Sequence, residues 1–223
     1  MIIANQIRAV ILDLDGTLMD TACEIDSALS RTFGELGIAP LDRRAVEALI
    51  GRGVHSLVER ALAGRGASAN VEKAVESFER HYESLVGSEA RLYPRVAEGL
   101  DLLRARNRKL GVVTNKPRLF TEKLLDRAGV SAMFAAVIAG DDGIARKPAG
   151  DMLVAACAKL GTAPAETLMV GDSDNDILAA RAAGCPVWCV PYGYNEGRPP
   201  ETLQCDRLVE TVEDVARLVI MAP

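Results

Sequence analysis

Strand-like and helix-like segments alternate over most of this 223-residue chain, and the alternation is interrupted once. Val10-Ile11-Leu12 is a short run of β-branched and leucine side chains that predicts a buried strand. Residues 20–92 then carry helical spacing throughout, and strand and helix patterns alternate again beyond Tyr93-Pro94. Such alternation is typical of a parallel sheet with helices on both faces. We therefore expect an α/β fold, a doubly wound parallel sheet into which an all-helical segment is inserted.

The insertion predicts two domains. The expected core consists of residues 1–19 and 94–223, and the expected helical domain of residues 20–93. We place the two hinges between them near Asp20 and near Pro94.

Three local patterns organise the helical segment. Thr21-Ala22-Cys23-Glu24 and Ser56-Leu57-Val58-Glu59 have the spacing of capping boxes, so each is expected to begin a helix. Gly51-Arg52-Gly53 predicts a tight turn, because glycine adopts backbone angles that other residues avoid.

Composition excludes several classes of protein. The formal net charge of −5 is spread along the chain and no basic stripe offsets it, which argues against a nucleic-acid partner. No segment approaches the ~20 apolar residues of a membrane span. The five cysteines are scattered, without a C-x-x-C pair, as expected of reduced thiols in a cytoplasmic protein. The composition leaves open whether the protein is a monomer or a homodimer.

Two acids follow the first strand directly. Asp13 and Asp15 stand one residue apart, before Gly16. Carboxylates this close raise each other's pKa unless a cation or a proton lies between them. A bound divalent metal ion is the simplest solution, and a polar turn at the strand end is the alternative.

Polar residues also follow other predicted strands, and these positions decide between the two interpretations. In open α/β sheets ligands bind at the carboxyl ends of the strands, so separate clusters can converge on one site. The four clusters are Asp13 with Asp15, Thr114 with Asn115, Lys147, and Asp172 with Asp176. Four clusters of compatible chemistry make a chance set of turns improbable.

The set suits phosphoryl transfer, in which the protein positions the group and stabilises its negative charge. Mg²⁺ between Asp13 and Asp172 would neutralise the repulsion between a carboxylate and a phosphate. Lys147 and the Thr114 hydroxyl would hold phosphoryl oxygens. Asp15 would protonate the leaving group and then activate water.

These residues resemble the motifs of the haloacid dehalogenase (HAD) superfamily, and the resemblance covers essentially the whole chain. The four matching motifs, in chain order, are Asp13-Leu14-Asp15-Gly16-Thr17, Thr114, Lys147, and Gly171-Asp172-Ser173-Asp174-Asn175-Asp176. The resemblance implies a Rossmann-like core with a helical C1-type cap that selects the substrate.

The resemblance also implies roles for the acids. Asp13 would be the nucleophile that forms an aspartyl phosphate. Asp15 would be the acid and base, and a metal ligand through its backbone carbonyl. Asp172 would be a metal ligand, and Asp176 either a ligand or a support for one. Dehalogenases of the superfamily lack the second acid, so Asp15 indicates a phosphatase or a phosphomutase.

Secondary patterns resemble the phosphoglycolate phosphatase branch. They are Thr114-Asn115-Lys116-Pro117, Gly51-x-Gly53 and Tyr192-Gly193-Tyr194-Asn195-Glu196-Gly197. The expected substrate is therefore a small phosphorylated metabolite, 2-phosphoglycolate. The residues expected to contact it are Asn115, Lys116, Arg52 and Gly53.

Other functions remain open at this point. A sugar phosphate, N-acetylmuramic acid 6-phosphate or pyrophosphate could be the substrate, and a β-phosphoglucomutase-like mutase could use the same residues. A phospho-accepting receiver domain also combines acids, Mg²⁺ and a lysine. Receivers resemble this motif order poorly and carry no helical insertion.

Overall fold

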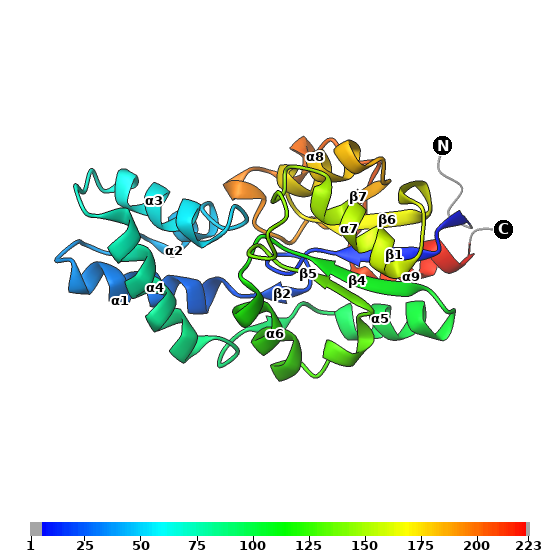
Figure 1. The fold of residues 1–223 in the computed structure, drawn as a ribbon, viewed down its shortest axis with the longest axis horizontal. Coiled ribbons are helices and arrows are strands. Elements are labelled where there is room, and N and C mark those ends of the chain that lie inside the picture. Colours follow the sequence, from blue (N-terminus) through cyan, green and yellow to red (C-terminus); the bar gives the residue numbers. More distant parts are fainter. Residues whose placement is uncertain (1–5, 222–223) are drawn as a thin grey trace.

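The computed structural model describes residues 6–221. Its centre is a six-stranded parallel sheet in the order β5-β4-β1-β6-β7-β8. The strands are β1 (Ala9–Leu12), β4 (Lys109–Val113), β5 (Ala136–Ile138), β6 (Thr167–Gly171), β7 (Val187–Cys189) and β8 (Arg207–Leu208). The first strand of the chain therefore lies inside the sheet, between β4 and β6 (Figure 1).

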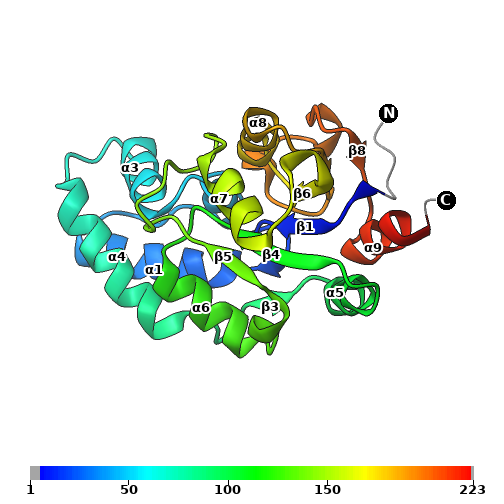
Figure 2. The same ribbon diagram turned by 45° about the vertical axis from the view of Figure 1, so that its right-hand side comes forward.

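Helices cover both faces of this sheet, as the alternating pattern predicts. They are α5 (Val96–Ala105), α6 (Arg118–Arg127), α7 (Asp151–Leu160), α8 (Asp174–Ala183) and α9 (Val212–Met221). Val10 and Leu12 pack into the core on the side of α5, α6 and α9, while Ala9 and Ile11 pack on the side of α7 and α8. Figure 2 shows these two helical layers below and above the sheet. The expected α/β fold is confirmed.

The inserted segment forms four helices beside the carboxyl ends of the central strands (Figure 1). They are α1 (Ala22–Glu35), α2 (Arg43–Glu47), α3 (Val54–Gly64) and α4 (Val71–Leu85). Phe33, Phe78 and Tyr82 are among the largest fully buried side chains of the protein. The division into two domains at residues 20 and 93 remains a prediction.

A short antiparallel ladder joins the two connections of the insertion. Strands β2 (Met19–Asp20) and β3 (Arg91–Leu92) pair Met19 with Leu92 and Asp20 with Arg91. The sequence did not predict this ladder, because two residues are too few to carry a strand periodicity.

Short 3-10 turns connect the longer elements described above: Ser131–Met133, Pro164–Glu166, Asn195–Gly197 and Pro200–Thr202.

None of the helices between residues 6 and 221 has the length and hydropathy that crossing a bilayer requires.

The predicted capping box at Thr21 is wrong. The Thr21 side chain makes no capping hydrogen bond; its hydroxyl donates to Asp15 Oδ1 at 2.6 Å. Glu24 is buried, and its carboxylate accepts three backbone N–H groups between Gly87 and Ala90, at 2.7–3.0 Å. Thr21 therefore contacts the first motif, and Glu24 contacts the backbone that follows α4, rather than the start of α1.

The second predicted capping box is also wrong, because α3 begins before it. The helix starts at Val54, and Gly53 precedes it with φ of 84°. Gly51 and Gly53 both have positive φ, so the predicted tight turn is present.

Candidate active site

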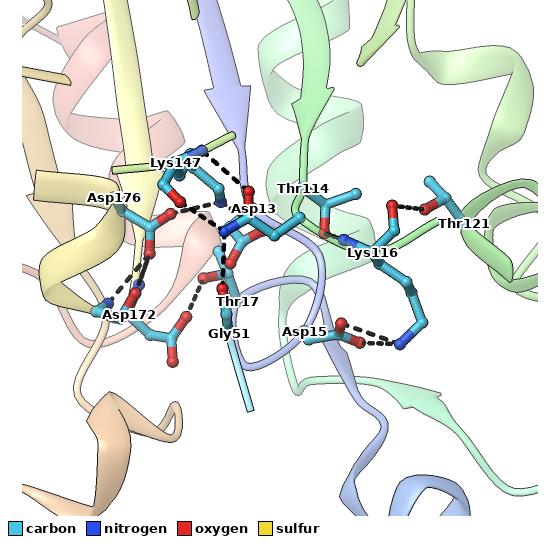
Figure 3. A network of polar contacts seen from close by, with 12 residues as sticks. Asp13, Asp15, Thr17, Gly51, Thr114, Lys116, Thr121, Lys147, Asp172 and Asp176 are labelled. Atoms are coloured by element: carbon cyan, nitrogen blue, oxygen red, sulfur yellow. Dashed lines mark hydrogen bonds and ion pairs between the residues drawn. The ribbon is translucent and has the colours of Figure 1, made fainter. Parts of the chain in front are cut away.

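Three adjacent parallel strands bring the predicted site residues to one edge of the sheet. Leu12, the last residue of β1, lies opposite Val112 of β4 and Val170 of β6. Asp13, Thr114 and Asp172 follow these strands within two residues, so they emerge at neighbouring positions (Figure 3). The convergence expected from the strand pattern follows from this register.

Asp13, Asp172 and Asp176 form a buried acidic cluster. One carboxylate oxygen from each lies within 4.8 Å of those of the other two. Burial raises the pKa of Asp13 to about 8, with Lys147 opposing the shift and the charges of Asp176 and Asp172 adding to it. Burial, followed by the charge of Asp176, raises the pKa of Asp172 to about 7. The cluster therefore favours a proton or a cation among its oxygens.

Lys147 lies between two of these acids. Its ammonium is 2.8 Å from Asp13 Oδ1 and 2.7 Å from Asp176 Oδ1, and its side chain is 1% exposed. Asn115 fixes the backbone of Lys147 from both sides: Nδ2 donates to the Lys147 carbonyl at 2.9 Å, and Oδ1 accepts the Lys147 N–H at 3.0 Å. The lysine is thus held rigidly against the nucleophile candidate.

Asp176 is fully engaged by the protein. Its Oδ2 accepts the backbone N–H groups of Asp172 and Ser173 and the Ser173 hydroxyl, at 2.8–3.2 Å. Its Oδ1 contacts Lys147.

Two hydrogen bonds hold the Asp172 carboxylate in place. The Thr17 hydroxyl donates to Oδ1 at 3.0 Å, and the Tyr194 backbone N–H donates to Oδ2 at 2.7 Å. Gly16 has φ of 87°, and a Cβ there would lie 2.5 Å from Asp172 Oδ2. Glycine therefore follows Asp15 because both the turn and the approach of Asp172 exclude a side chain.

Asp15 occupies a separate environment. The Thr21 hydroxyl donates to Oδ1, and the Lys116 ammonium contacts both carboxylate oxygens at 2.9 and 3.0 Å. Lys116 is buried, and its ammonium lies 4.8 Å from the centre of the Tyr82 ring. Burial opposes protonation of Lys116, but Asp15 outweighs this effect and raises its pKa. Each acid of the first motif therefore pairs with a different lysine, Asp13 with Lys147 and Asp15 with Lys116 (Figure 3).

A small cavity lies between the core and the helical insertion. Its volume is about 30 Å³, room for about two water molecules. The core residues that line it are Asp13, Asp15, Thr114, Asn115 and Lys116, and the insertion supplies Ile25, Ile50, Gly51, Gly53, Val54, Leu57, Phe78 and Tyr82. The two acids and Thr114 thus share one cavity with an apolar wall from the insertion.

Two contacts connect the tight turn of the insertion to the core. The Gly51 carbonyl accepts Asn115 Nδ2 at 3.0 Å. Arg52 Nε and Nη2 donate to the Glu196 carboxylate at 2.5 and 2.8 Å. Among the residues expected to contact substrate, Asn115, Lys116 and Gly53 line the cavity and Arg52 does not. The substrate-binding role of Arg52 remains a prediction without a contact to support it here.

The acidic cluster fits a divalent cation. Asp13 Oδ1 is buried, and its ion pair with Lys147 is its single polar contact within residues 6–221. Carboxylate oxygens are the ligands that hard divalent cations prefer. The site holds two buried lysines and four acids, which are Asp13, Asp15, Asp172 and Asp176. When all are ionised, two negative charges are left over, and one divalent ion would balance them.

Several contributors were not predicted from the sequence. Thr17 stands inside the first motif but carried no assigned role, and Thr21 was assigned to a helix cap. Tyr82 lies within residues 20–92, whose helical spacing assigns it no role in the site. The periodicity signals that its helix face is buried, but it cannot signal that the face meets the site.

Fold and site together define a class: an α/β phosphoryl-transfer enzyme whose acids and lysines gather at the carboxyl ends of parallel strands. The sequence model of the haloacid dehalogenase-like hydrolase family matches residues 7–184. The chain belongs to this family, and the resemblance read from its motifs is confirmed.

Relatives match along nearly the whole chain. The phosphoglycolate phosphatase of Nitrosospira multiformis is 42% identical over 217 residues, which cover 96% of each chain. That of Thiobacillus denitrificans is 40% identical over 97% of each chain. A crystal structure described as a predicted phosphoglycolate phosphatase from Haemophilus somnus superposes with a TM-score of 0.87. It is 29% identical and covers 96% of this chain and 98% of its own.

Proposed function

We propose that this protein hydrolyses 2-phosphoglycolate with Mg²⁺ and an aspartyl-phosphate intermediate at Asp13. The observation that carries the mechanism is that Asp13 and Asp15 line one cavity, each paired with its own buried lysine. The substrate assignment is supported by the two full-length relatives, whose names specify phosphoglycolate.

Asp13 is the nucleophile in this proposal. A carboxylate oxygen attacks phosphorus, and the bond from phosphorus to the glycolate oxygen breaks. Lys147 stabilises the ionised form of Asp13, and the Thr114 hydroxyl, which lines the same cavity, holds a phosphoryl oxygen. Mg²⁺, when bound, supplies positive charge that stabilises the phosphoryl oxygens as a Lewis acid.

Asp13, Asp172 and the backbone carbonyl of Asp15 would hold the metal ion. Asp176 supports the site rather than binding metal directly, because both of its oxygens already contact donors of the protein. Of the two roles that the resemblance implies for Asp176, we therefore propose the supporting one.

Asp15 is the acid and the base. It gives a proton to the glycolate oxygen as that oxygen leaves. The resulting carboxylate then takes a proton from water, whose oxygen attacks phosphorus, releases phosphate and regenerates Asp13. Lys116 and Thr21 hold Asp15 in place for both steps.

Asn115 acts on the lysine rather than on the substrate. Its amide is occupied by both backbone groups of Lys147 and by the Gly51 carbonyl. We therefore assign it to positioning Lys147 and to docking the insertion.

The size of the cavity supports a short substrate. About two waters fit at present, so the insertion must open for any substrate to enter. The β2-β3 ladder is the connection about which it would move. The insertion lines the cavity with six aliphatic or aromatic side chains, of which only Tyr82 carries a polar group, so the hydroxyl groups of a sugar would find few partners there. 2-Phosphoglycolate has no sugar hydroxyl groups, so it presents none to this wall.

The free thiols of all five cysteines are compatible with the cytoplasm.

Phosphate release tests the proposal. The full-length protein with Mg²⁺ should give its highest kcat/KM on 2-phosphoglycolate, compared with a sugar phosphate, N-acetylmuramic acid 6-phosphate and pyrophosphate. Equal or better hydrolysis of one of these would reject the substrate. A phosphoprotein that accumulates without releasing phosphate would reject hydrolysis, and Asp13→Asn provides the inactive control.

A further inference from the structure

The Tyr82 hydroxyl lines the cavity, is buried, and donates to no acceptor within residues 6–221. Buried hydroxyl groups are nearly always paired in folded proteins. An unpaired hydroxyl at the wall of a ligand cavity therefore indicates a partner that arrives with the ligand.

The Tyr82 side chain is held in one position. It is 1% exposed, stacks on Phe78 of the same helix at 5.6 Å between ring centres, and meets Phe120 of α6 edge-on at 4.9 Å. Because Phe120 belongs to the core, Tyr82 also contacts the core from the insertion. Burial raises the pKa of Tyr82, so its hydroxyl stays protonated and can donate a hydrogen bond.

A buried ammonium lies beside Tyr82. The Lys116 ammonium is 4.8 Å from the centre of the Tyr82 ring, and it also pairs with Asp15. The rest of the insertion's wall is apolar or glycine. A donor hydroxyl beside a buried ammonium is the combination that recognises a carboxylate.

We propose that Tyr82 determines substrate specificity by donating a hydrogen bond to the carboxylate of the substrate, beside the Lys116 ammonium. The inference rests on the proposed function, because it assigns the carboxylate of 2-phosphoglycolate to this wall. It also gives the packing of the insertion against the core a chemical purpose, since this packing places Tyr82 at the cavity.

Tyr82→Phe tests this, because it removes one oxygen atom and leaves the ring contacts in place. The substrates are 2-phosphoglycolate and ethyl phosphate, which has a similar length and no carboxylate. The variant should lose about tenfold or more in kcat/KM on 2-phosphoglycolate, the value of a hydrogen bond to a charged group. Its kcat/KM on ethyl phosphate should stay the same.

Tyr93→Phe is the matched control. Tyr93 packs on Tyr192 at 4.4 Å between ring centres and does not line the cavity, so the substrate preference of that variant should equal the wild-type value.

Three outcomes would overturn the inference. Equal losses on both substrates in Tyr82→Phe would show a general role for the hydroxyl, and no loss on either substrate would show no role in recognition. Either result leaves the proposed function intact. If the wild-type enzyme had equal kcat/KM on ethyl phosphate and on 2-phosphoglycolate, the proposed substrate and this inference would both be rejected.

Discussion

The Lys116 ammonium contacts both carboxylate oxygens of Asp15, at 2.9 and 3.0 Å, although the two residues are 101 positions apart. Both side chains are largely buried, with 5% and 11% exposed. The pair connects the segments that follow β1 and β4, and both residues line the cavity between the core and the insertion. It is therefore both a part of the site and a connection within the fold.

Replacing Lys116 with methionine should lower the free energy of unfolding by about 3–5 kcal/mol, because Asp15 stays buried without its partner. Urea unfolding measures the loss. Lys123→Met is the control: its ammonium pairs with Glu83 at 2.9 Å on the surface, and the expected loss is about 1 kcal/mol or less. Similar small losses in both variants would contradict the structural role of Lys116.

Asp13→Asn and Asp15→Asn should fail in different ways. The first variant should lose turnover on every ester while keeping its fold, because an amide oxygen is a poor nucleophile. The second should lose much more with an alkyl phosphate than with nitrophenyl phosphate, whose leaving group needs no proton. Steady-state kinetics on both esters, with circular dichroism to verify folding, separate the roles. Equal losses on the two esters in Asp15→Asn would remove Asp15 as the acid.

Without bound metal, the free energy of unfolding should fall as pH rises. Burial raises the pKa of Asp13 to about 8 and of Asp172 to about 7. The folded state therefore holds protons that the unfolded state releases, so this stabilisation is complete at low pH and is lost as pH rises through these values. Protein in EDTA should be less stable at about pH 8.5 than at about pH 5.5.

Saturating Mg²⁺ should reverse most of that loss, because the cation replaces the protons, and its affinity should rise with pH over the same range. Thermal unfolding with EDTA and with Mg²⁺ at both pH values provides the comparison. Equal stability of the metal-free protein at the two pH values would mean that the acids are not protonated in the folded state.

Arg52 provides a test of the substrate role that its position in the sequence suggested. The structure pairs it with Glu196, and half of the Arg52 side chain is exposed. Arg52→Ala and Glu196→Ala should therefore change kcat/KM by similar amounts, about threefold or less, as expected of an exposed ion pair. A tenfold rise in KM for Arg52→Ala alone would indicate that the guanidinium binds substrate.

The sequence by itself determined the fold class and most of the acidic site. Asp13, Thr114 and Asp172 each follow an apolar strand, and parallel strands end at the same edge of a sheet. Their convergence therefore needs no knowledge of packing. The helical insertion was equally visible, because it interrupts the strand–helix alternation for some seventy residues.

Only the tertiary structure decided what surrounds these residues. Thr21 and Glu24 have the spacing of a capping box, yet one bonds to Asp15 and the other to backbone near residue 89. Helical periodicity tells which face of a helix is buried but not which element covers it. For that reason the hydroxyl of Tyr82, on an ordinary apolar helix face, acquires its significance only where α4 meets Lys116 and the cavity.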